Sequence, residues 1–305
     1  MISPDILKKG DTISLAAPGR FITETEINDF TGLANSWGLK MNLPAGLFAR
    51  HHQFAGDDST RRKCLQQVMD DTEIKAIFCA RGGYGSLRIL ERIKMKKYAR
   101  FPKWIIGFSD ITAIHAYLNN QGFETVHALM PFSYRSSDKD SALSSASLHE
   151  VLFTAPPDYQ FAGHPMNTIG TAEGELIGGN LSVIYSLQAT PWQFNPQNRI
   201  LFVEDVDEYL YHIDRMMTNL RLSGFLSQLK GIVVGYMSEM HDNKIPFGSD
   251  ACRIIAAAVK TFGYPVCFGF PAGHKDPNNA LILGRKVRLE AGKKLCRLQF
   301  AAQDE

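Results

Sequence analysis

Residues 101–122 read FPKWIIGFSDITAIHAYLNNQG, and this stretch predicts a strand, a tight turn and a helix. An apolar run at 104–106 ends at Gly107, and apolar residues at helical spacing follow Asp110. Ser109 is therefore expected in the turn, where its hydroxyl projects beyond the strand's carboxyl end, beside the first helical N–H groups. A catalytic nucleophile can use this geometry. The alternative is purely structural, because either Ser109 or Asp110 would serve as a helix cap.

The first half of the chain alternates between apolar strands and amphipathic helices. Strands are expected at 11–19, 40–43, 74–80 and 104–107, with helices at 23–37, 57–72 and after 110. This order predicts an α/β domain with a parallel sheet, helices on both faces and ligands at the carboxyl ends of the strands.

The glycine-rich turn RGGYG at 81–85 follows one of these strands, so it is expected at the same sheet edge as Ser109. Glycines let the backbone approach a ligand closely, and the N–H groups of Gly82 and Gly83 are candidates to line an oxyanion pocket. Ordinary turn formation is the alternative explanation. The spacing fits neither a phosphate-binding P-loop nor a dinucleotide fingerprint, and we expect no cofactor.

Composition places the chain among ordinary globular proteins. Its 305 residues are 45% hydrophobic and 21% charged, with a formal net charge of +2. A net charge this small gives no strong positive potential that would attract nucleic acid or an anionic membrane, so neither partner is expected. The start lacks the pattern of a secretory signal, and the five cysteines are scattered without a C-x-x-C pair. We therefore expect a cytoplasmic protein with reduced thiols.

A change in composition marks the expected domain boundary. Residues 133–147 are polar and serine-rich, a short helix is expected at 148–153, and prolines follow. We expect an N-terminal α/β domain at 1–153, a linker at 154–170 and a C-terminal mixed α+β domain at 171–305. The last domain should end in antiparallel strands near 287–290 and 295–300.

Three candidate catalytic features fall at expected loops or strand ends: Ser109, the acidic cluster EDVDE at 204–208, and His274. Serine hydrolysis requires a hydroxyl, an imidazole that takes its proton and a carboxylate that orients the imidazole. The acidic cluster could instead bind calcium or magnesium. No calcium loop follows it and the sequence lacks H-E-x-x-H, so we expect no metal.

Several motifs, in order along almost the whole chain, resemble the LD-carboxypeptidase family, peptidase family S66. They are KKGDTISLAAPG, FAGDDSTR, ARGGYG at 80–85, GFSDIT at 107–112, GELIGGNLS at 174–182, LFVEDVDEYLYHIDRMMTNLRLSG at 201–224 and AGHKDPNNALILG at 272–284.

The resemblance implies a serine carboxypeptidase that releases the terminal D-alanine from murein tetrapeptide in the cytoplasm during cell-wall recycling. It implies a nucleophile at Ser109, an orienting carboxylate at Glu204 and a base at His274, at a domain interface. The oxyanion would be held by N–H groups of Asp110 and of Gly82 or Gly83. Further candidate residues for substrate binding are Arg81, Asn180 and Lys275, with a cation expected to bind the terminal carboxylate. We also expect a homodimer.

The sequence departs from the family pattern at Lys275, at Asp207, where glycine is usual, and at 127–130, where H-G-P-M is usual. Two alternatives therefore stay open for function. Family members of the self-immunity type use the same triad to cleave a peptide-nucleotide toxin. The other alternative is an inactive protein that binds wall peptides.

Overall fold

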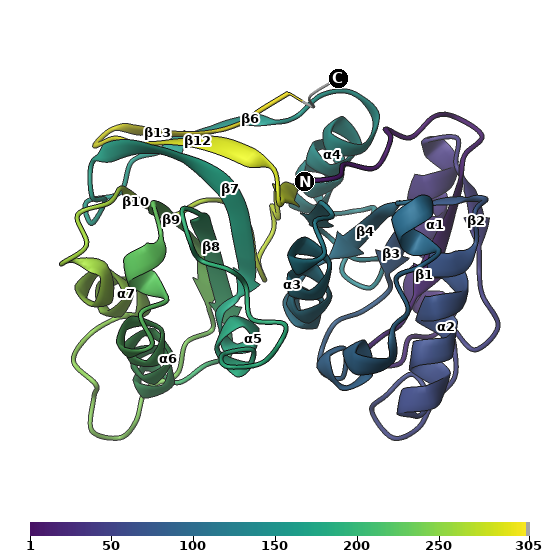
Figure 1. The fold of residues 1–305 in the computed structure, drawn as a ribbon, viewed down its shortest axis with the longest axis horizontal. Coiled ribbons are helices and arrows are strands. Elements are labelled where there is room, and N and C mark those ends of the chain that lie inside the picture. Colours follow the sequence, from purple (N-terminus) through teal and green to yellow (C-terminus); the bar gives the residue numbers. More distant parts are fainter. Residues whose placement is uncertain (303–305) are drawn as a thin grey trace.

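The chain forms two lobes that lie side by side, each built around one β-sheet (Figure 1). The computed structural model describes residues 1–302. The N-terminal lobe is purple and blue in Figure 1, and the second lobe is green and yellow. Helix α3 (Thr112–Asn120) lies at the junction, where it contacts strand β7 (Gly170–Asn180) of the second lobe. Within residues 1–302, no helix is both long enough and apolar enough to cross a membrane.

The first sheet has six strands in the order β11-β5-β4-β3-β1-β2. Their bounds are β1 (Thr12–Ala16), β2 (Lys40–Asn42), β3 (Ile74–Cys79), β4 (Trp104–Gly107), β5 (Thr125–His127) and β11 (Leu281–Leu283). The first five are parallel, and the sequence predicted the parallel sheet and four of these strands but not β5. Strand β11 was not predicted here. It comes from the second half of the sequence and pairs antiparallel with β5.

The first lobe contains the three helices that the apolar spacing predicted, and short 3-10 helices at 87–92 and 98–100 that it did not predict. They are α1 (Asn28–Ser36), α2 (Asp58–Asp70), α3, and the short 3-10 helices η1 (Thr25–Ile27), η2 (Leu87–Arg92), η3 (Tyr98–Arg100) and η4 (Ser109–Ile111). The carboxylate of Asp57 caps α2 by accepting a hydrogen bond from the Thr60 N–H at 2.7 Å. Strand β4, which leads to Ser109, is buried along its whole length, as its continuous apolar run indicated.

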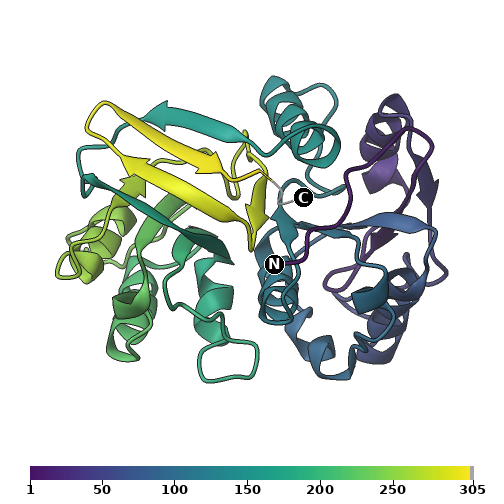
Figure 2. The same ribbon diagram turned by 45° about the horizontal axis from the view of Figure 1, so that its top comes forward.

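The second sheet has seven strands in the order β10-β9-β8-β7-β12-β13-β6. Their bounds are β6 (Asp158–Ala162), β7, β8 (Ile200–Val206), β9 (Gly231–Ser238), β10 (Val266–Phe268), β12 (Lys286–Ala291) and β13 (Leu295–Phe300). The long strand β7 pairs with β12 in antiparallel orientation on one side and with β8 in parallel orientation on the other. The expected mixed domain with antiparallel final strands is confirmed, and Figure 2 shows β12 and β13 in yellow.

The second lobe carries helices α5 (Leu181–Ser186), α6 (Leu210–Leu222) and α7 (Ala251–Val259), and the 3-10 helix η5 (Leu226–Gln228). Their apolar faces pack with the parallel strands in one core cluster that includes Leu201, Ile213 and Ile255. The ends of β4 and β8 lie close together, because Ser109, which follows β4, and Val206, the last residue of β8, line one cavity.

The serine-rich stretch is helical, so the short helix expected at 148–153 was wrong in its starting point. Helix α4 spans Lys139–Phe153 and is capped by Asp138, whose carboxylate accepts a hydrogen bond from the Asp140 N–H. Two serines of this polar stretch, Ser144 and Ser147, are buried and bond to residues 276–280. The range 154–170, expected as a linker, contains β6, which pairs with β13.

Candidate active site

Ser109 occupies a sharp turn between β4 and α3. Its φ of +63° lies in the left-handed region, which costs a non-glycine residue about 1–2 kcal/mol. Such strain is frequent at functional sites, where surrounding structure enforces it. Neither η4 nor α3 has a side-chain cap, so the capping role considered for Ser109 and Asp110 is not observed.

The carboxylate of Asp110 ties the Ser109 turn to the glycine-rich turn. Asp110 is 4% exposed, and its Oδ2 accepts hydrogen bonds from the backbone N–H of Ser86 at 2.9 Å and its hydroxyl at 2.7 Å. Burial raises the pKa of Asp110, opposed by these hydrogen bonds. The buried Arg61 guanidinium donates to the carbonyl of Gly85 at 2.8 Å. The two turns expected at one sheet edge are therefore held together by buried polar groups.

Gly82 and Gly83 form part of the wall beside Ser109. A Cβ at Gly82 would lie 3.0 Å from Ser109 Cβ and 3.2 Å from Ser109 Oγ, so only glycine fits without displacement. Within residues 1–302, neither glycine uses its N–H group in a backbone hydrogen bond. These donors are available beside the serine hydroxyl.

Glu204 lies at the end of β8 and is completely buried. The register between β8 and β9 shifts here: Val203 pairs with Val234, but Asp205 pairs with Met237. Strand β9 thus places two residues opposite Glu204, which is a β-bulge of the kind often found beside active sites. One of these residues, Tyr236, donates its backbone N–H to Ala272 O at 2.9 Å and so anchors the start of the His274 loop.

His274 lies on the loop between β10 and β11, and its ring Nδ1 donates a hydrogen bond to Glu204 Oε2 at 2.7 Å. A Cβ at Gly273, whose φ is +127°, would lie 2.8 Å from that same oxygen, so glycine permits the close approach. The side chain of Asn278 accepts the Gly273 N–H at 2.9 Å. Ser144 of α4 in turn accepts the Asn278 N–H at 2.8 Å. The loop is therefore fixed from both lobes.

The electrostatics favour a basic imidazole at His274. Burial lowers its pKa, but the charge of Glu204 and the hydrogen bond to it outweigh burial, so the pKa lies above its usual value. With Nδ1 bonded to a carboxylate, the proton is on Nδ1 and Nε2 carries the free lone pair. Burial and the charge of Glu204 raise the pKa of neighbouring Asp205 to about 7.

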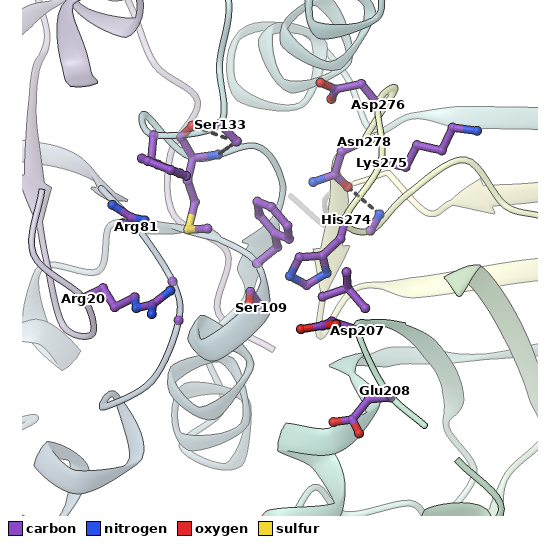
Figure 3. A pocket seen from close by; sticks show the side chains of 17 residues that line it. Arg20, Arg81, Ser109, Ser133, Asp207, Glu208, His274, Lys275, Asp276 and Asn278 are labelled. Carbon is purple, nitrogen blue, oxygen red and sulfur yellow. Dashed lines mark hydrogen bonds between the residues drawn. The ribbon is translucent and has the colours of Figure 1, made fainter. Parts of the chain in front are cut away.

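Ser109 and His274 line the same cavity, of about 580 Å³, whose walls come from both lobes (Figure 3). Phe108, the residue before Ser109, packs edge-on against the His274 ring with centroids 4.8 Å apart. The strand end that carries the hydroxyl thus contacts the imidazole of the other lobe. A hydroxyl, an imidazole with a buried carboxylate behind it and free N–H donors are the components of acyl transfer by serine.

The structure does not bring every expected binding residue to the cavity. Arg81 lines it but pairs with Glu26, with Nη1 and Oε1 3.2 Å apart. Lys275 also lines it, yet its ammonium lies 5.8 Å from the Tyr236 ring and points away from Ser109 in Figure 3. Asn180 is buried, bonds to Asp205 at 2.8 Å and caps α5. Its side chain does not line this cavity.

Sequence reasoning missed three residues that shape the site. Arg20 follows β1 and lies 89 residues before Ser109 in the sequence, yet it lines the same cavity. Asn278 and Ser144 fix the His274 loop. The signal for Arg20 was its position after β1, because the end of that strand lies at the same sheet edge as the glycine-rich turn.

The acidic side chains at 204–208 bond to other residues rather than converging on one point. Within residues 1–302, no group of three or more histidine, cysteine, aspartate or glutamate side chains is arranged to hold a metal ion. Instead, Glu208 bonds to His212 and Asp207 to His241. Asp207 has a φ of +61°, a left-handed conformation that glycine adopts without strain.

Both lobes correspond to known domains. Family models for the LD-carboxypeptidase N-terminal domain and the LD-carboxypeptidase C-terminal domain match residues 13–128 and 173–289. The chain belongs to the LD-carboxypeptidase family, peptidase family S66, as its motifs indicated.

Individual relatives align with this chain over almost its full length. A "probable murein peptide carboxypeptidase" of Bacillus subtilis is 32% identical over 298 residues, which cover 95% of this chain and 92% of the relative. The structure of muramoyltetrapeptide carboxypeptidase from Oxalobacter formigenes superposes with a TM-score of 0.88 at 26% identity, covering 95% and 98% of the two chains. The microcin C7 self-immunity protein MccF has the same fold, with a TM-score of 0.86 at 20% identity and 98% coverage of both chains.

Proposed function

We propose that this protein is a serine LD-carboxypeptidase that releases the terminal D-alanine from murein tetrapeptide. One observation carries the proposal: in a chain of this family, Ser109 and His274 line one cavity between the lobes, and the buried Glu204 bonds to the His274 ring behind it. The names of the Bacillus and Oxalobacter relatives support the substrate class.

In the proposed first step, His274 Nε2 takes the Ser109 proton while Ser109 Oγ attacks the carbonyl carbon that precedes the terminal residue. Glu204 orients the imidazole and stabilises its positive charge. The N–H groups of Asp110 and of Gly82 or Gly83 hold the oxyanion. Collapse of the tetrahedral intermediate breaks the C–N bond, and the imidazolium proton goes to the leaving amine.

In the second step, water enters and gives a proton to His274 as its oxygen attacks the acyl-serine ester. The second intermediate collapses, Ser109 regains its proton and the shortened peptide leaves with a new carboxylate. Because these steps use only side chains and backbone N–H groups of the protein, activity should survive exhaustive chelation.

We place this reaction in the cytoplasm, as the resemblance to murein-recycling enzymes implies, and five free cysteines support a reducing compartment. We also propose a homodimer, which light scattering after size-exclusion chromatography would test. Cell fractionation with an antibody against the chain would test the compartment.

The deciding experiment incubates purified protein with murein tetrapeptide, an aminoacyl-nucleotide conjugate and buffer alone, and follows the products by mass spectrometry. Release of D-alanine from the tetrapeptide is expected. Cleavage of the conjugate alone would move the substrate class to peptide-nucleotides. Binding of the tetrapeptide without cleavage of either compound would indicate an inactive binding protein.

A further inference from the structure

The walls of the cavity carry opposite charges. Figure 3 shows Arg20 and Arg81 entering from the first lobe, and Asp207 and Glu208 facing them from the second lobe. An anionic group of a ligand is therefore favoured beside the first lobe and disfavoured beside the second.

Most of these charged groups already have partners in the protein. Arg81 pairs with Glu26, and its guanidinium also lies 3.8 Å from the centroid of the Phe132 ring. Arg20 differs from Arg81. Within residues 1–302, its guanidinium makes no ion pair, and its side chain is exposed at the cavity.

The backbone positions the Arg20 side chain beside the glycine-rich turn. Its N–H donates to Gly82 O at 3.2 Å. Its aliphatic stem lies across Gly83, where a Cβ would overlap Arg20 Cγ and Cδ. Because Gly82 also abuts Ser109, the turn connects the arginine directly to the candidate nucleophile.

We propose that the Arg20 guanidinium binds the free α-carboxylate of the residue that the enzyme releases. This inference rests on the proposed function. In an exopeptidase substrate that carboxylate lies only three bonds from the scissile carbonyl carbon, so its partner must be close to Ser109. The planar fork of arginine can bond both carboxylate oxygens, and a partnerless guanidinium gives up no protein contact to do so.

The experiment compares murein tetrapeptide with the same peptide amidated at its carboxyl end. The value of kcat/KM is measured for wild type, Arg20→Gln, Arg20→Lys, Arg81→Gln and Arg50→Gln. Arg50 is the matched control because it stacks on Phe21 beside Arg20 and does not line the cavity. Thermal unfolding of each variant checks that the fold is intact.

Wild type and Arg50→Gln should prefer the free acid by about 10- to 100-fold, the usual value of a charge-assisted bidentate contact. Arg20→Gln should lose this preference because its kcat/KM falls for the free acid and not for the amidated peptide. Arg20→Lys should keep part of the preference, and Arg81→Gln should keep most of it. A wild-type protein that cleaves neither peptide contradicts the proposed function. Three results would overturn the role of Arg20 and leave the proposed function standing. They are a wild type that lacks the preference for the free acid, a preference that survives in Arg20→Gln, and an equal fall of the preference in Arg20→Gln and Arg81→Gln.

Discussion

The backbone of Gly82 lies directly against the side chain of Ser109. A Cβ at position 82 would stand 3.0 Å from Ser109 Cβ and 3.3 Å from Met130 Cε, closer than most real Cβ contacts. The glycine-rich turn and the candidate nucleophile come from different strands, so this contact sets the space in which a carbonyl oxygen can enter between them.

Gly82→Ala should therefore lower kcat/KM by about 10-fold or more, because small displacements of a reacting group have large effects on rate. Steady-state kinetics on the tetrapeptide measure this. Gly32→Ala is the matched control, since its Cβ would meet no atom within 4 Å and it lies inside α1. That control should keep full activity and gain about 0.5–1 kcal/mol of stability. Equal activity in the two variants would contradict the steric argument.

Replacing Ser109 should separate activity from stability. Ser109→Ala and Ser109→Gly should both lose at least about 10³-fold in kcat, because a triad without its nucleophile retains only residual catalysis. Only glycine relieves the left-handed φ of +63°, so Ser109→Gly should be more stable than Ser109→Ala by about 1 kcal/mol in denaturant unfolding. An active alanine variant would remove Ser109 from the mechanism.

The His274–Glu204 pair should set the acid limb of the pH profile. The base must be neutral, so kcat/KM should fall as the pH drops through a pKa above the usual value of 6.5. Glu204→Gln removes the charge that raises this pKa, and the limb should move to lower pH. An unchanged limb in that variant would show that another group controls it.

The same pair should also make stability depend on pH. Because folding raises the pKa of His274, its contribution to the free energy of unfolding is complete below about pH 6.5. It is lost as the pH rises through the higher pKa of the folded state. Wild type should therefore lose stability over this window relative to Glu204→Gln, which urea unfolding at a series of pH values would detect.

A buried ion pair near the lobe junction should matter more than surface pairs. Arg285 Nε donates to Glu124 Oε1 at 2.7 Å, and both residues are almost fully buried. Glu124→Ala leaves the buried guanidinium without a counter-charge, with only the Ser3 hydroxyl still accepting from it. This should cost about 3–5 kcal/mol, whereas the double variant Glu124→Leu/Arg285→Met should recover most of the loss. Glu290→Gln, which breaks an exposed pair with Arg288, should cost less than about 1 kcal/mol.

The sequence by itself determined the strand, turn and helix that carry Ser109. Strand β4, the turn at Ser109 and helix α3 follow from apolar spacing within about twenty residues, since spacing reports directly which face is buried. The alternation of strands and helices also predicted that the glycine-rich turn and Ser109 share one sheet edge. These features depend on local periodicity and on the short, right-handed connections of parallel strands.

Only the tertiary structure decided which polar residues meet. Glu204 and His274 are 70 residues apart and come together through the bulge in β9 and the bonds to Asn278, neither of which leaves a local pattern. Residues 133–147 are polar and serine-rich, and a sequence does not show whether solvent or protein bonds their hydroxyl groups. In the fold, the buried serines of α4 satisfy backbone groups of residues 278 and 280.

Arg20 and Arg81 illustrate the same limit. Both are cations at strand ends of one sheet edge, and the sequence pointed to Arg81 because it adjoins the glycine-rich turn. Tertiary packing supplies Glu26 and Phe132 to Arg81 and leaves the Arg20 guanidinium facing the cavity across Gly83. Charge is a property of the residue, but its availability to a ligand depends on the neighbours that the fold brings within hydrogen-bond reach.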